Sequence, residues 1–366
     1  MIIPREYVQR RLCAVRKKLA DHSLDALVLL NDETRGWENV YYLSGFKGTS
    51  AVVFITSEKA VVTVDSRYIT QARQQCCFDV HETRDGVLAA MKRFLKGVSR
   101  VAFDAGTLSA HNYIFLQNDK QEWYDFSREL GSLRRHKDDW EVCCIKKAAK
   151  IATDAYLDTL SSVREGLTEL EFCKTLELAV SHHGGEGIWH NSSMIVASGI
   201  RSAMPHGVAT TKKFKRGDMV TIDFGAIYGE YMSDITRNFT LGVPTHPEFA
   251  EIYKVIQTAH DQSAARLKPG MRTNEIHSVA QNIINDAGYG DCFSHALGHS
   301  FGLEIHEKPV LSPRSDEILA VGDVVTIEPG IYIPGRGGLR LEDDYLITSD
   351  GAECLTANLT QELLLL

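Results

Sequence analysis

Apolar and polar positions follow two different patterns along the chain, and the change of pattern divides the chain in two. In the first part, short apolar stretches predict strands at 24–30, 50–55, 60–65 and 101–104, with a weaker one at 78–81. Helical spacing of apolar residues predicts helices at 4–22 and 87–96. This alternation of short strands and helices predicts a small α/β domain with a mixed sheet.

A polar, turn-rich segment at 131–139 (GSLRRHKDD) ends this pattern. We place the domain boundary there, which gives domains 1–133 and 134–366. Beyond it, the spacing predicts longer helices at 138–163, 168–183, 247–266 and 273–287, with β-hairpins between and after them. Because the combination of helices and a hairpin occurs twice, we predict an α+β domain with pseudo-twofold symmetry.

The first hairpin lies in residues 217–237, GDMVTIDFGAIYGEYMSDITR. Its outgoing strand, 219–223, is rich in apolar and β-branched residues, and Tyr228-Gly229 is the predicted two-residue turn. A turn centred there places Asp223 opposite Asp234. Directly opposed side chains have Cβ atoms about 4.5–5.5 Å apart, so two carboxylates are expected side by side.

The second hairpin begins at Gly322, 105 residues after Gly217, with the related sequence GDVVTIEPGIYIPGRGGLRLEDD. Centring its turn on Gly335 pairs Glu328 with Glu342. Like charges directly opposite each other destabilise a sheet. Two such pairs inside otherwise apolar strands predict that the four carboxylates hold metal.

Histidines supply the remaining candidate chemistry. His295, His299 and His306 occur within one segment, glycines surround His299, and His206 follows Met-Pro earlier in the chain. Four carboxylates and an imidazole suit two Mn²⁺, Co²⁺ or Fe²⁺ ions, with Zn²⁺ also compatible. The charge of two divalent ions balances four carboxylates and leaves room for a bridging hydroxide, the usual nucleophile of two-metal sites.

Composition excludes several other classes of protein. The 366 residues are 44% hydrophobic and 24% charged, which is typical of a globular chain long enough for two domains. A net charge of −8 gives no basic surface for nucleic acid. No apolar run approaches the ~20 residues of a membrane span. The eight cysteines form no CxxC motif, and the N-terminus lacks the apolar core of a signal peptide, so we expect reduced thiols and a cytoplasmic protein.

Four segments together carry a family resemblance: TIDFGAIYGEYMSDITR, HALGHSFGLEIHE, TIEPGIY and LRLED. They resemble the signature blocks of the pita-bread metallopeptidases, and within these the Xaa-Pro peptidases, aminopeptidase P and prolidase. The segments NVYYLSGF and VDSRY resemble the N-terminal domain of the same branch. The resemblance therefore covers nearly the whole chain and implies a pita-bread catalytic domain after a creatinase/prolidase-like domain.

The resemblance also implies a role for each candidate ligand. Asp223 chelates one metal ion, Asp234 bridges both ions, His299 and Glu328 bind the second, and Glu342 bridges. Glu328 is in addition the implied proton shuttle between water and the leaving nitrogen.

The remaining implied roles concern the substrate. His206, His295 and His306 surround it and stabilise the tetrahedral intermediate, while Arg340 lies near the pocket for proline. The implied reaction is hydrolysis of the bond between an N-terminal residue and proline, in small peptides, by a homodimer. We favour an aminopeptidase acting on longer peptides over a strict dipeptidase.

Three other interpretations remain. A metal-free amidinohydrolase like creatinase shares the fold, and so do peptide-binding modules without activity; both classes lose the metal carboxylates that this chain keeps. A methionine aminopeptidase shares the ligand set, but the N-terminal domain of about 135 residues argues against it. Activity that survives chelation would favour the first alternative, and binding without turnover the second.

Overall fold

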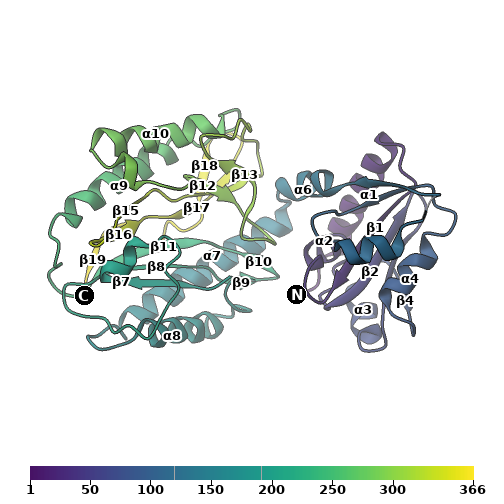
Figure 1. Cartoon of the computed structure of the whole chain (residues 1–366), viewed down its shortest axis with the longest axis horizontal. Helices are drawn as coiled ribbons and strands as arrows, with labels where there is room; N and C mark the ends of the chain where they lie inside the picture. The colour runs from purple at the N-terminus through teal and green to yellow at the C-terminus, as the bar shows by residue number, and fades with distance from the viewer. Residues whose placement is uncertain (119, 191) are drawn as a thin grey trace. The chain divides into compact units, whose positions relative to one another are not determined.

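The structure is a computed structural model that describes residues 1–118, 120–190 and 192–366 (Figure 1). The chain separates into two compact units, Met1–Arg134 and Arg135–Leu366. This division falls one residue from the boundary expected from the sequence. No helix in the described part of the chain is long and apolar enough to cross a bilayer.

The N-terminal unit is built on a six-stranded mixed sheet in the order β4-β3-β2-β1-β5-β6. Strand β1 is antiparallel to β2 and parallel to β5, as a mixed sheet requires. The strands are β1 (Ala26–Asp32), β2 (Ser50–Thr56), β3 (Ala60–Val64), β4 (Asp79–Glu82), β5 (Arg100–Phe103) and β6 (Glu122–Asp125). The helices are α1 (Arg5–Asp21), α2 (Trp37–Ser44), α3 (Ile69–Gln75), α4 (Val87–Phe94), α5 (Ala110–Leu116) and α6 (Ser127–Arg135).

One local expectation in this unit was wrong. The segment 131–139 was expected to be a turn-rich linker, but α6 extends through its first five residues to Arg135. The helix buries Leu130 and Arg134 on one side, and burial of this face stabilises a sequence whose polar composition suggested a loop.

The C-terminal unit contains two helix pairs, each packed on its own sheet. Helices α7 (Asp139–Leu160) and α8 (Glu169–His182) share one apolar core with β8 and β11. Helices α9 (Phe249–Ala264) and α10 (Thr273–Asp286) share a second core with β14 and β17. In Figure 1 the two pairs lie on opposite sides of the strands. This duplicated arrangement is the predicted pseudo-twofold α+β domain.

Two main sheets form the centre of this unit. One has the order β19-β11-β8-β7 and the other β13-β12-β14-β17-β18, and two short hairpin ends, β9-β10 and β15-β16, extend from them. The first set comprises β7 (Ile195–Ser198), β8 (Met219–Phe224), β9 (Ile227–Tyr228), β10 (Tyr231–Met232), β11 (Ile235–Thr240) and β19 (Leu364–Leu365). The second comprises β12 (Gly298–Ser300), β13 (Glu307–Leu311), β14 (Val324–Ile327), β15 (Gly330–Ile333), β16 (Gly337–Arg340), β17 (Asp343–Ile347) and β18 (Ala352–Cys354).

The turn of the first hairpin differs from the prediction. Gly229 and Glu230 both have positive φ, 58° and 68°, so they form the two-residue turn in place of Tyr228-Gly229. The register consequently pairs Asp223 with Thr236, and the predicted pairing of Asp223 with Asp234 is wrong. Because the shift is two residues, the side chains keep their faces, and Asp234 becomes a diagonal neighbour of Asp223.

The second hairpin has the predicted register. Ile327 pairs with Asp343 on one side of the interruption, and Gly330 pairs with Arg340 on the other. Both pairings belong to one continuous register, in which Glu328 faces Glu342. The turn contains Gly335 with a φ of 78°, a conformation that glycine adopts without strain.

Candidate metal centre

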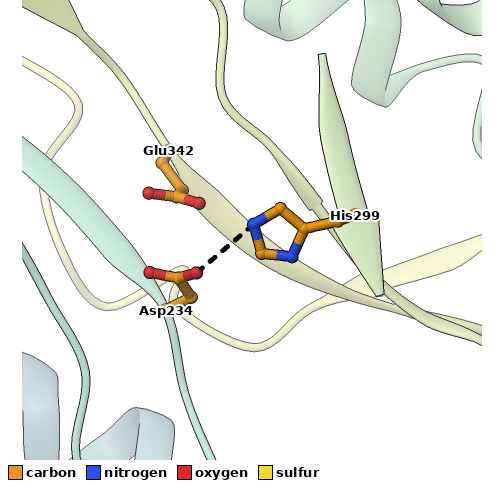
Figure 2. Close-up of side chains that lie close together, drawn as sticks. All are labelled: Asp234, His299 and Glu342. Carbon is orange, nitrogen blue, oxygen red and sulfur yellow. Dashed lines mark ion pairs between the residues drawn. The ribbon is translucent and has the colours of Figure 1, made fainter. Parts of the chain in front are cut away.

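Three of the predicted ligands offer atoms that all lie within 4.8 Å of one another: Asp234, His299 and Glu342. Figure 2 shows the imidazole facing both carboxylates, with His299 Nε2 3.7 Å from Asp234 Oδ2. Asp234 and Glu342 are 4% and 1% exposed. Three groups of this type in one buried place form a candidate cation site.

The two hairpins meet where their ladders are interrupted. Glu342 forms an isolated bridge with Thr236, its amide donating to the Thr236 carbonyl (3.3 Å). The Thr236 hydroxyl donates to Glu342 Oε2 (2.7 Å), and the amide of Asp234 donates to Asp344 Oδ2 (3.1 Å). The carboxylates therefore come together because the backbone of one hairpin is hydrogen-bonded to the other.

The other two predicted ligands border the same cluster. Glu328 Oε1 lies 3.4 Å from His299 Nε2. The Asp223 carboxylate accepts a hydrogen bond from Arg340, whose Nε is 3.9 Å from Glu328 Oε2. The structure thus gathers all five residues, although it groups only Asp234, His299 and Glu342 tightly.

Electrostatics show how costly this arrangement is without positive charge. Burial, followed by the charges of neighbouring carboxylates, raises the pKa of Asp234 and of Glu342 well above the ordinary range. Burial likewise raises the pKa of Glu328 to about 8. Burial lowers the pKa of His299 to about 3, so its imidazole is neutral and does not balance the carboxylates. Divalent cations would supply the missing positive charge.

Two further features fit such cations. Asp223 Oδ1 and Asp234 Oδ1 are buried and accept no hydrogen bond within the described residues, so these oxygens are available to a cation. His299 Nδ1 lies 3.2 Å from the Ser300 carbonyl, which can only accept. The proton is therefore on Nδ1, and Nε2 presents its lone pair to the carboxylate cluster, as a metal ligand must.

The predicted substrate-facing residues surround this cluster. The rings of His299 and His306 have centroids 4.4 Å apart. His206 lies close enough to contribute to the lowered pKa of both His295 and His306, although burial is the largest cause for each. The structure therefore places His206, His295 and His306 near one another, with His306 beside the proposed ligand His299.

Tyr332 is a site residue to which the sequence analysis gave no role. Arg340 Nη1 donates to its hydroxyl (2.6 Å), and the hydroxyl lies 3.0 Å from His295 Nε2. His295 Nδ1 is 2.7 Å from the Ala296 carbonyl, so it carries the proton and Nε2 accepts from Tyr332. Tyr332 is the last residue of the block TIEPGIY, which also contains the proposed ligand Glu328. Its place in that block was the only sequence feature that could have indicated a role at the site.

A pseudo-twofold α+β domain that buries carboxylates and an imidazole where two hairpins meet defines a class of metal-dependent hydrolases. Residues 143–349 match Metallopeptidase family M24, and residues 11–136 match the Creatinase/Prolidase N-terminal domain. The chain belongs to metallopeptidase family M24, which confirms the family resemblance, the pita-bread fold and the dependence on divalent metal that this family implies.

Individual relatives match over almost their full length. The chain is 36% identical to a Xaa-Pro dipeptidase of Pyrococcus horikoshii over 92% of this chain and 93% of that one. A solved Xaa-Pro dipeptidase of Bacillus anthracis superimposes with a TM-score of 0.91 at 36% identity, covering 98% of this chain and 100% of that one. An X-Pro aminopeptidase of Thermotoga maritima gives 0.90 at 33% identity, covering 97% and 99%.

Proposed function

We propose that this protein is a Xaa-Pro exopeptidase that uses two divalent cations. The observation that carries the proposal is the convergence of Asp234, His299 and Glu342, with Asp223 and Glu328 beside them. Two relatives that align with more than nine-tenths of the chain are named Xaa-Pro dipeptidases, which supports cleavage of the bond before proline. Mn²⁺ is the ion we propose first, with Co²⁺, Fe²⁺ and Zn²⁺ as alternatives.

The five ligands divide between two cation positions. Asp223 would hold the first, His299 and Glu328 the second, and the carboxylates of Asp234 and Glu342 would be shared. When bound, such ions polarise the scissile carbonyl and lower the pKa of water. The protein fixes its ligands with hydrogen bonds from Thr236 and Arg340, which limit the movement of Glu342 and Asp223.

Side chains around the cations would manage the proton and the substrate. Glu328 borders the cluster, with Oε1 3.4 Å from His299 Nε2, so we assign it transfer of a proton to the leaving nitrogen. His206 and His306 would donate hydrogen bonds to the substrate carbonyl. Both nitrogens of His295 are already engaged, by Ala296 and Tyr332, so its role is to position Tyr332 and Arg340.

Proline suits a site of this kind. The nitrogen of proline is part of the ring and has no N–H in a peptide bond, and the ring fixes φ. An enzyme that grips an extended backbone by its N–H groups loses that contact, whereas a site that binds the α-amine and the carbonyl does not need it. Carboxylate oxygens at the edge of the cluster could accept hydrogen bonds from a free α-amine.

For the length of the substrate we propose Xaa-Pro dipeptides. The Pyrococcus horikoshii and Bacillus anthracis relatives are both named Xaa-Pro dipeptidases. The preference for longer peptides that we drew from the sequence becomes the second candidate, supported by the Thermotoga maritima neighbour. The homodimer and the cytoplasmic location stay predictions, which sedimentation and cell fractionation would test.

The test is turnover of matched Xaa-Pro, Xaa-Pro-Yaa and Xaa-Ala peptides by protein stripped with a chelator and reconstituted with one metal at a time. We expect hydrolysis of Xaa-Pro only after reconstitution, and little hydrolysis of Xaa-Ala. Faster hydrolysis of the tripeptides would establish the aminopeptidase instead. Full activity after complete chelation would refute the metal-dependent proposal and favour the creatinase-like alternative.

A further inference from the structure

A single buried carboxylate holds both ends of the loop that carries His206. The loop, residues 199–210, follows β7 and begins with a short 3-10 helix, Gly199–Ala203. Glu169, at the start of α8, is fully buried (0% exposed) and lies beneath it. We define the loop clamp as Glu169 with its partners Ser198, Arg201 and Thr210.

The contacts of the loop clamp are divided between the two ends of the loop. Glu169 Oε1 accepts from the amide (2.9 Å) and the hydroxyl (2.7 Å) of Ser198, just before the loop. Glu169 Oε2 accepts from the amide (3.0 Å) and the hydroxyl (2.8 Å) of Thr210 at its end. Arg201, inside the loop, also donates to Oε2. Five donors on one carboxylate tie down the whole segment.

The far side of the loop reaches the candidate site. Arg340 Nη1 donates to the carbonyl of Pro205, the residue before His206 (3.2 Å). The amide of Gly338 donates to the Ser202 hydroxyl (2.9 Å). Arg201 Nη2 donates to the Val208 carbonyl, two residues after His206 (2.8 Å). The loop is therefore fixed between Glu169 and the strand that bears Arg340.

Helix capping does not account for Glu169. The N-cap of α8 is Thr168, whose hydroxyl accepts from the Glu171 amide, while the Glu171 carboxylate accepts from the Thr168 amide. This capping box is complete without Glu169. Because Glu169 is buried, takes no part in the cap and joins the two ends of one loop, we expect it to stabilise the conformation of that loop.

We propose that Glu169 is a positioning residue that sets the place of His206 at the candidate metal centre. This inference rests on the proposed function only for the role of His206 toward the substrate. Among the described residues, the Glu169 carboxylate is hydrogen-bonded to Ser198, Arg201 and Thr210 and to none of the proposed ligands, so its effect on catalysis passes through the loop. Loss of the clamp is expected to misplace His206 while leaving the cation ligands where they are.

The first test is Glu169→Gln. The side chain keeps its size, but its amide N–H groups face the donors of the loop clamp and cannot accept from them. We expect kcat/KM for Xaa-Pro dipeptides to fall about 10- to 100-fold. Glu171→Gln is the matched control, because it weakens the cap of the same helix without touching the loop, and it should change kcat/KM less than about 2-fold. Thr210→Val, a milder change, should act in the same direction as Glu169→Gln.

A double-variant cycle separates positioning from general damage. If Glu169 acts through His206, Glu169→Gln should cost little further activity once His206→Ala is present. Mn²⁺ affinity, measured by calorimetry, should be the same in Glu169→Gln and the wild type. Independent, additive losses in the cycle, or a large fall in Mn²⁺ affinity, would overturn the proposal.

Hydrogen exchange gives a readout that needs no substrate. Amides of residues 199–208 should exchange at least about 10-fold faster in Glu169→Gln and Thr210→Val than in wild type or Glu171→Gln. If the wild type hydrolysed no Xaa-Pro peptide, the proposed function would fail while exchange still decided whether the clamp exists. Unchanged exchange in both clamp variants would refute the clamp itself.

Discussion

The two hairpins of the C-terminal unit share one sequence pattern but contribute different chemistry. The first presents aspartates, Asp223 and Asp234, as diagonal neighbours beside a tight two-residue turn. The second presents longer glutamates, Glu328 and Glu342, which face each other within the interruption of an otherwise continuous register. The longer glutamate side chains reach the carboxylate cluster around His299 from positions that face each other directly.

The strands next to the hairpins differ as well. Beside β8 lies β7, which is entirely buried and supplies no proposed ligand. Beside β14 lies β12, which carries His299. The second half also carries Arg340 and Tyr332, where the position corresponding to Tyr332 in the first repeat, 105 residues earlier, is Ile227. The two halves thus share a symmetric frame, and the second contributes most of the nitrogen and hydroxyl groups near the proposed ligands.

The largest expected effect comes from removing the carboxylate that joins the two halves. Glu342→Ala removes the group that both accepts from Thr236 and borders His299. We expect turnover of Xaa-Pro peptides to fall by on the order of 10³-fold or more, with loss of at least one bound cation by calorimetry. Glu353→Ala, at an exposed position of β18, is the control and should retain activity. Tight binding of two cations by Glu342→Ala would contradict the shared role.

The second prediction concerns the stability of the contact between the hairpins. Arg237 is 3% exposed, pairs with Asp343, and donates to the carbonyls of Thr236 and Glu342. Arg237→Met leaves Asp343 buried without its main partner, which typically costs about 3–5 kcal/mol. Thermal unfolding should show a Tm about 6–20 °C lower.

An exposed ion pair provides the matched control for this prediction. Lys146 pairs with Glu353 on the surface, with side chains 42% and 48% exposed. Lys146→Met should change stability by less than about 1 kcal/mol, because solvent screens exposed pairs. If Arg237→Met lost no more stability than Lys146→Met, the contacts of Arg237 between the hairpins would contribute no more than an exposed ion pair.

The third prediction uses the pH dependence of the cation-free protein. Glu328, with a pKa of about 8, binds more protons when folded than when unfolded, and the pKa of Asp234 and Glu342 is raised further. Stability from this source is present at low pH and is lost as pH rises toward 8 and beyond. His295 and His299 act in the opposite direction, but their lowered pKa values confine that effect to pH below about 6.5.

Without divalent cations, Tm should therefore fall between pH 7 and 8.5. Mn²⁺ at 100 times the Kd measured at pH 7 should raise Tm at that pH by about 5–10 °C. The same Mn²⁺ concentration should raise Tm by more at pH 8.5, because deprotonated carboxylates bind the cation more tightly. Glu328→Gln should flatten the dependence in the cation-free protein. A Tm that rises over this interval in the absence of cations would contradict the assignment of buried carboxyl groups.

The four carboxylates could be predicted from the sequence because each belongs to a repeated local pattern of strand, turn and strand. The register of the first hairpin could not, since a glycine can occupy either position of a two-residue turn and only Glu230 with positive φ distinguishes them. The fold class followed from periodicity and was confirmed. Strand β6 was not predicted from the sequence, because it is short, largely exposed and shows no alternation of apolar and polar residues.

The residues that support the site were beyond sequence reasoning. Glu169 contacts Ser198 and Thr210, 29 and 41 positions away, and Arg237 contacts Asp343, 106 positions away. A lone buried charge has no local signature, because its partner is fixed only when distant segments pack. Local pattern therefore identifies the candidate ligands, while the hydrogen bonds that orient them depend on the tertiary structure.

The smallest expected effect concerns the Tyr332 hydroxyl, which has no counterpart at Ile227 in the first hairpin. Tyr332→Phe keeps the ring and removes the link between Arg340 and His295. We expect kcat/KM to fall about 10-fold with Mn²⁺ affinity unchanged, because the proposed ligands keep their own hydrogen bonds. Ile227→Val, at the corresponding position of the first hairpin, should change kcat/KM less than 2-fold. If Tyr332→Phe were equally silent, the Arg340–Tyr332–His295 chain would be incidental, and the two halves would differ in the imidazole of His299 more than in what surrounds it.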